Sequence, residues 1–151
     1  MLAGKESLLG RLAAAAARLV SSKRLRGHER LVLDAWRGSL RPDARLVLDK
    51  QLEAVRFVQR QAGDAKVVFY YDGKADIPEF QNLNPDLHIA TVVLRPADGA
   101  KEQFLKVKVF IHRGRFFSLE FPKRPSRYLQ LHHMKMETLH IDRIEDAGSL
   151  N

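Results

Sequence analysis

The chain has 151 residues, 45% of them hydrophobic, which is enough apolar material for one domain with its own core. It contains no cysteine, which excludes disulfides, a thiol nucleophile and cysteine-ligated zinc or iron–sulfur centres within this chain. The formal net charge of +8 favours an anionic partner, namely nucleic acid, anionic lipid or an acidic protein.

Residues 1–26 are predicted to form an amphipathic basic helix. Five consecutive alanines at 13–17 favour a helix, and apolar residues recur at helical spacing along one face. The segment is too short and too charged to span a membrane. We expect it to pack on the core. The alternatives are a detachable arm, a helix that contacts a membrane surface or a partner, and an organelle transit peptide. The apolar face consists of Leu8, Leu9, Leu12, Ala16, Leu19 and Val20.

Two further helices are expected before the strands begin. The first covers about residues 29–37 and is ended by Gly38 and Ser39. The second starts at Pro42, a residue favoured at the first helical position, and is expected to continue to Gly63. The stripe that supports this long helix consists of Ala44, Leu48, Leu52, Val55, Val58 and Ala62.

Beyond residue 63 the apolar residues alternate with polar ones, as in half-buried strands. Residues 72–87 are expected to form a long loop, residues 128–136 fit a strand, a short helix or an irregular segment, and residues 145–151 form a frayed tail. The fold class is therefore α+β in a single domain over residues 1–151. About three N-terminal helices pack on a twisted, mainly antiparallel sheet of four to five strands. These strands are expected at 67–71, 89–94, 104–112, 116–121 and 138–144.

The strand over 104–112 has the clearest alternation, with its apolar residues predicted inward and Lys106 and Lys108 outward. A three-residue loop after this strand is favoured over a two-residue loop. It pairs Ile111 with Phe117 and keeps one continuous apolar face across the hairpin. The same register places Lys108 opposite a glutamate, which is a favourable cross-strand pair.

The sequence predicts no catalytic residue, cofactor or metal site. It has no glycine-rich phosphate loop and no Gly-x-Ser-x-Gly elbow, and its six histidines include no helical His-x-x-x-His pair. An enzyme with its active site under the 72–87 loop remains an alternative, with Asp72, Asp76 and Glu79 as candidate acid–base groups.

The basic clusters are the best-supported candidate sites. Eight Lys or Arg and two Glu give residues 101–127 a net charge of +6. The first hypothesis is a cytoplasmic, non-enzymatic accessory protein of the immunity or adaptor kind that binds an acidic protein. The second is a protein that binds RNA or single-stranded DNA through a basic and aromatic sheet face. A simply solvated basic face is the structural alternative. The candidate residues are Lys106, Lys108, Arg113, Arg115, Lys123, Arg124, Arg127 and Tyr128.

Overall fold

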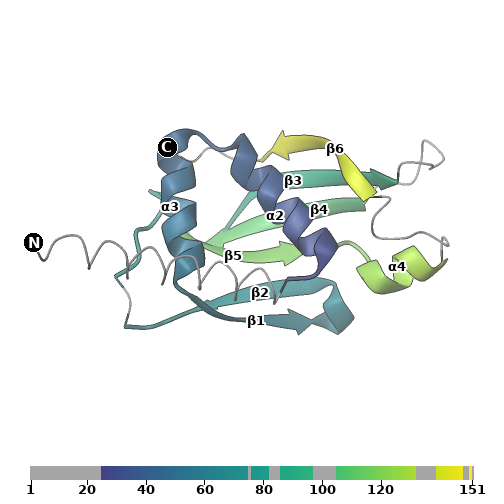
Figure 1. The fold of residues 1–151 in the computed structure, drawn as a ribbon, viewed down its shortest axis with the longest axis horizontal. Coiled ribbons are helices and arrows are strands. Elements are labelled where there is room, and N and C mark those ends of the chain that lie inside the picture. The colour runs from purple at the N-terminus through teal and green to yellow at the C-terminus, as the bar shows by residue number, and fades with distance from the viewer. Residues whose placement is uncertain are drawn as a thin grey trace, which may run out of the picture.

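A computed structural model describes residues 25–74, 76–81, 86–96, 105–131, 139–147 and 150 (Figure 1). The helix predicted over residues 1–26 therefore lies outside the described residues, except for Leu25 and Arg26. The described helices are α2 (Gly27–Ser39), α3 (Pro42–Glu53) and α4 (Pro125–Leu131), with a short 3₁₀ turn, η1 (Ala62–Asp64). The strands are β1 (Val55–Gln61), β2 (Lys66–Tyr71), β3 (Asp86–Pro96), β4 (Leu105–His112), β5 (Arg115–Glu120) and β6 (Leu139–Asp146).

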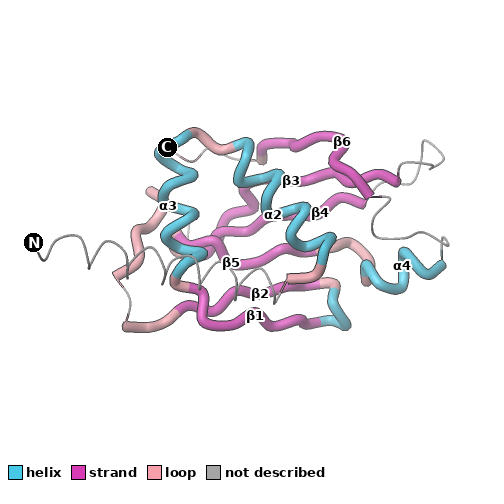
Figure 2. The backbone as a smooth tube through the Cα atoms, viewed as in Figure 1, coloured by secondary structure: helices cyan, strands magenta, loops and turns pink. Residues whose placement is uncertain are grey.

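The strands form one antiparallel sheet in the order β1-β2-β5-β4-β3-β6. Helices α2 and α3 lie against the same face of this sheet, and α4 lies at one end of it (Figures 1 and 2). The predicted α+β class is confirmed. The predicted count of four to five strands is wrong, because the described residues form six and the additional strand is β1.

The third predicted helix ends earlier than expected. Helix α3 stops at Glu53, and the stretch predicted to continue it to Gly63 contains β1 instead. A bulge at Arg56 shifts the pairing of β1 with β2, so that Val55 and Val58 share one side of the strand and both pack against the core. Their spacing of three residues therefore resembles a helical repeat although the backbone is extended.

The β4–β5 hairpin combines the two registers that the sequence allows. Its turn consists of Arg113 and Gly114 alone, so the predicted three-residue loop is wrong. Ile111 pairs with Phe116, and Phe117 forms a one-residue bulge. Beyond the bulge the predicted pairing is restored. The apolar residues of β4 are buried and its two lysines are exposed, as predicted.

The C-terminal part differs from the prediction in detail. The ambiguous segment 128–136 begins within α4, which is helical to its last described residue. Strand β6 extends to Asp146, so the tail predicted to fray from Glu145 is paired for two more residues. A one-residue bulge in β6 turns Ile144 toward the core and leaves Arg143 exposed.

The core lies between the two helices and the sheet. Trp36 of α2 is 1% exposed, and its ring centroid lies 5.4 Å from that of Phe116. Phe116 in turn lies 4.5 Å from Phe69, while α3 contributes the fully buried Leu48. Burying a side chain of this size stabilises a fold by about 1.5–3 kcal/mol. This aromatic cluster holds α2 over β2 and β5.

Gln51 fastens α3 to the tip of the β4–β5 hairpin. Its buried amide oxygen accepts a hydrogen bond from the backbone N–H of Phe116 at 2.9 Å. Its amide nitrogen donates to the carbonyls of Pro78 at 2.8 Å and Gly114 at 2.9 Å. The backbone N–H of Phe80 donates to the same Gly114 carbonyl at 2.7 Å. One side chain thus joins the helix, the hairpin and the 76–81 loop.

Replacing Gly114 by alanine tests this junction. Gly114 has a φ of +76°, and an added Cβ would lie 2.7 Å from the Phe80 carbonyl oxygen. We expect Gly114→Ala to lower the free energy of unfolding by about 2–4 kcal/mol, because backbone strain and a steric clash add. Gly38→Ala in α2 is the control, since its Cβ would meet nothing within 4 Å, and it should stabilise by roughly 0.5–1 kcal/mol. Equal effects of the two substitutions in urea denaturation would contradict the expectation.

Candidate binding site

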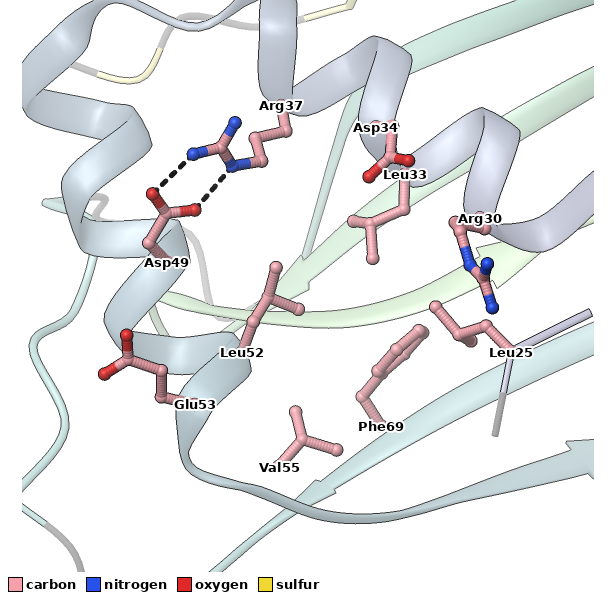
Figure 3. A pocket seen from close by; sticks show the side chains of 10 residues that line it. All are labelled: Leu25, Arg30, Leu33, Asp34, Arg37, Asp49, Leu52, Glu53, Val55 and Phe69. Atoms are coloured by element: carbon pink, nitrogen blue, oxygen red, sulfur yellow. Dashed lines mark hydrogen bonds and ion pairs between the residues drawn. The ribbon is translucent and has the colours of Figure 1, made fainter. Parts of the chain in front are cut away.

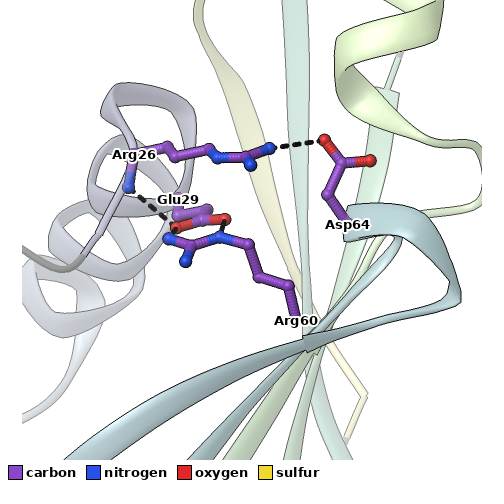
Figure 4. Close-up of polar contacts among 4 residues, drawn as sticks. All are labelled: Arg26, Glu29, Arg60 and Asp64. Atoms are coloured by element: carbon purple, nitrogen blue, oxygen red, sulfur yellow. Dashed lines mark hydrogen bonds and ion pairs between the residues drawn. The ribbon is translucent and has the colours of Figure 1, made fainter.

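Four charged side chains meet where α2 begins above the β1–β2 turn (Figure 4). Glu29 has no exposed surface and accepts two hydrogen bonds from Arg60, at 2.8 and 2.7 Å. The backbone N–H of Arg26 donates to Glu29 Oε2 at 2.8 Å, and the Arg26 guanidinium donates to Asp64 at 2.7 Å. Its hydrogen bond to Glu29 raises the pKa of Arg60. Removing either Glu29 or Arg60 alone would cost about 3–5 kcal/mol, because the remaining charge would be left without its partner.

His28 packs beside these charges. Its side chain is 1% exposed, and neither ring nitrogen has a hydrogen-bond partner among the described residues. Its ring meets that of Phe121 edge to face, with centroids 5.3 Å apart. Burial lowers the pKa of His28 below its ordinary value, against the opposing influence of Glu29 and Asp64. His28 is therefore a neutral packing residue at neutral pH.

One hollow, which we call the tip hollow, lies at the β4–β5 turn and has a volume of about 490 Å³. Two of the predicted binding residues, Arg113 and Arg115, line it. Arg113 is exposed, whereas Arg115 Nε lies 3.2 Å from a Glu79 carboxylate oxygen. The Arg115 guanidinium also lies 6.0 Å from the ring centroid of Tyr71. Positive charge at this end is therefore partly neutralised.

Aromatic side chains form much of the tip hollow, and the sequence did not predict them as site residues. The hydroxyl of Tyr71 donates to the backbone carbonyl of Phe116, and burial raises the pKa of Tyr71. Phe117 reaches the hollow because its bulge adds it to the outward face of β5. The aromatic run at 69–71 was the available signal. The remaining ring-bearing residues of the lining are Phe69, Tyr70 and His112.

The two predicted lysines of β4 are exposed on the sheet face away from α2 and α3. Glu120 lies opposite Lys108, as predicted, but its carboxylate binds the ammonium group of Lys66 from β2 at 2.8 Å. Lys106 and Lys108 have no ion-pair partner within the part of the chain that the structure describes.

The other four predicted residues meet around α4. Lys123, Arg124, Arg127 and Tyr128 line a second hollow of about 440 Å³ together with Leu131, and we call it the α4 hollow. Leu131 is 66% exposed. In the described ranges, no carboxylate forms an ion pair with any of the three cations. The α4 hollow therefore combines three cationic side chains with exposed apolar surface.

Arg124 also has a structural role. Its guanidinium lies over the β1–β2 turn, where a Cβ added to Gly63 would lie 2.5 Å from Arg124 Nε. Gly63 itself has a φ of +70°. The eight residues predicted as one binding surface thus divide into the tip hollow, the two β4 lysines and the α4 hollow.

The described part of the predicted 72–87 loop is attached to the domain. The Asp72 carboxylate accepts a hydrogen bond from the backbone N–H of Lys74 at 3.1 Å, and Phe80 is buried. Among the described side chains, no three His, Asp or Glu residues are placed to bind one metal ion. None of the helices in the described ranges is long and apolar enough to cross a membrane.

No protein-family model, curated protein or solved structure matches this chain. The tip hollow and the α4 hollow lie at opposite ends of the sheet formed by the described strands.

His28 should make stability depend on pH. Its pKa is lower in the folded than in the unfolded chain, so the unfolded chain binds more protons as the pH falls below about 6.5. The free energy of unfolding should therefore decrease between about pH 7 and 5. His28→Leu should reduce this slope, measured by urea denaturation across that range. An unchanged slope in His28→Leu would refute the assignment.

Proposed function

We propose that this protein is a non-enzymatic binding protein that recognises an acidic segment of a protein partner through the α4 hollow. The proposal depends on one observation. The cations of this hollow have no carboxylate partner among the described residues, whereas Arg115 and Lys66 do. An acidic segment with a hydrophobic side chain would neutralise Lys123 and Arg127 and cover Leu131.

The lysines of β4 extend this positive region. Glu120 lies opposite Lys108 and precedes Lys123 by three residues, so Lys108 lies toward the α4 end of the sheet. Charges of one sign gathered on one region attract an oppositely charged partner and raise its association rate. Glu120 subtracts little from this attraction, because it is already bound to Lys66.

The test is the double substitution Lys123→Glu and Arg127→Glu. Both residues are exposed, whereas Arg124 is left unchanged because it packs over the β1–β2 turn. The probe is a fluorescent peptide of Glu and Asp with leucine at regular intervals, measured by anisotropy. We expect binding to weaken at least about tenfold, because two attractive contacts become repulsive.

The control is Lys50→Glu with Lys74→Glu, which changes the net charge equally at exposed positions on α3 and in the turn after β2. This variant should bind like the original protein. A similar loss in both variants would indicate non-specific charge attraction and reject the α4 hollow. Affinity purification from the native host should likewise retain a protein partner after nuclease treatment and lose it with the Lys123/Arg127 variant.

A second candidate function is the binding of RNA or single-stranded DNA across the sheet face that carries Lys106 and Lys108. The observation that favours it is the alternation of rings and cations on neighbouring strands. Phe57 is 45% exposed and stacks on Tyr70 with ring centroids 4.6 Å apart. Lys66 lies 5.7 Å from the ring centroid of Phe117. Bases stack on such rings, while lysines contact phosphates.

A short fluorescent oligouridine tests the second candidate. If bases stack here, Phe57→Ala should weaken binding roughly five- to a hundredfold, and affinity should fall steeply between about 50 and 200 mM salt. Leu46→Ala is the control, since Leu46 is 57% exposed on α3, away from this face. No binding at about 50 mM salt would eliminate the nucleic-acid function and leave the acidic-peptide proposal untouched.

A further inference from the structure

An apolar groove separates α2 from α3 above the first two strands (Figure 3). Its volume is about 390 Å³, and Leu33, Leu52 and Phe69 point into it from α2, α3 and β2. Between the two helices, Arg37 donates two hydrogen bonds to Asp49, at 2.6 and 2.7 Å. A groove with this interior is suited to aliphatic side chains. A segment that fills this groove therefore needs several aliphatic side chains along one face.

The described part of the chain begins at this groove. Leu25, the first described residue, is one of the groove's lining residues. Arg26 is fixed immediately after it, because its backbone N–H is bound to Glu29 and its guanidinium to Asp64 (Figure 4). Whatever precedes Leu25 in the chain is joined to it by a peptide bond, and this link raises the effective concentration of the segment near the groove.

The sequence of residues 1–24 complements the groove. Its predicted helical face carries leucines and valine, and the adjacent alanines would let a helix approach closely. Arg11 and Arg18 flank that face on one side of the helical wheel. Besides the paired Arg37 and Asp49, the groove lining carries the carboxylates of Asp34 and Glu53 and the guanidinium of Arg30, so one net negative charge faces the two arginines. Apolar surface and charge thus match at the same place.

We propose that residues 8–20 dock as an amphipathic helix in the groove between α2 and α3. Leu8, Leu12 and Leu19 enter the groove, and Arg11 and Arg18 face its acidic border. The docked helix adds a third helix to the covered face of the sheet.

Disulfide cross-linking tests the docking directly, because the natural chain has no cysteine. Leu8→Cys, Leu12→Cys and Leu19→Cys are each combined with Leu52→Cys in the full chain. At least one pair should form an intramolecular disulfide about tenfold faster than the control, Leu12→Cys with Phe57→Cys, whose second cysteine lies on the opposite face. A native-like circular dichroism spectrum and a cooperative melting transition establish that each variant is folded.

Each other cross-linking outcome overturns the proposal. Rates equal to the control would mean that the segment is a free arm. Cross-linked dimers in place of monomers would mean that a second copy fills the groove. Sedimentation of the full chain with vesicles containing phosphatidylserine, with loss of the intramolecular cross-link, would mean that the segment binds membranes.

A second measurement does not depend on cysteine. Leu12→Glu should lower the melting temperature by about 5–15 °C, because a charge would enter an apolar groove. Ala14→Glu is the matched control, since residue 14 lies opposite the apolar arc on the helical wheel, and it should melt like the natural chain. Equal melting of both variants would also overturn the docking.

Discussion

A single carboxylate without exposed surface controls how the parts of this domain fit together. Glu29 needs opposite charge at its own position, so Arg60 of β1 and the Arg26 backbone must lie within hydrogen-bonding distance whenever the chain is folded. This requirement fixes the start of α2 above the first hairpin. The neighbouring turn carries Asp64, which holds the Arg26 side chain. The position of Arg26 and the position of α2 therefore depend on the same small group of charges.

The surface chemistry depends on which cations already have a partner. Arg115 and Lys66 form ion pairs with carboxylates of this chain, so their charge is partly neutralised. Lys123 and Arg127 have no such partner in the described ranges, and they lie beside exposed apolar surface. Only part of the net charge of +8 can therefore contribute to binding a partner. The α4 hollow is the place where attraction for an anion and contact with an apolar group coincide.

Local patterning predicted most of the sheet, and bulges account for several of its errors. The alternation in β4 was sufficient to assign its buried and exposed sides, because one extended backbone fixes both. At Arg56 and Phe117 an extra residue changes which side of the sheet the following side chains occupy. The bulge at Arg56 made strand β1 resemble a helix, and the bulge at Phe117 led to the wrong hairpin loop. For the tip hollow, the sequence indicated Arg113, Arg115 and the aromatic run at 69–71 separately but not that they meet. Its residues come from separate strands and a loop, and only the tertiary fold brings them together.

The bulge at Phe117 also has a consequence for how this hairpin tolerates a change in length. Phe116 and Ser118 already pair with adjacent residues of β4, so Phe117 is a supernumerary position in the ladder. Omitting that one residue would give a regular two-residue hairpin in which every remaining side chain keeps its side. Omitting Leu119 instead would shift the following residues by one position and turn their side chains to the other side of the sheet. A change in the length of this strand is therefore tolerated best at Phe117, which lines the tip hollow. Such a change would alter the aromatic lining of the hollow and leave the core residues in place.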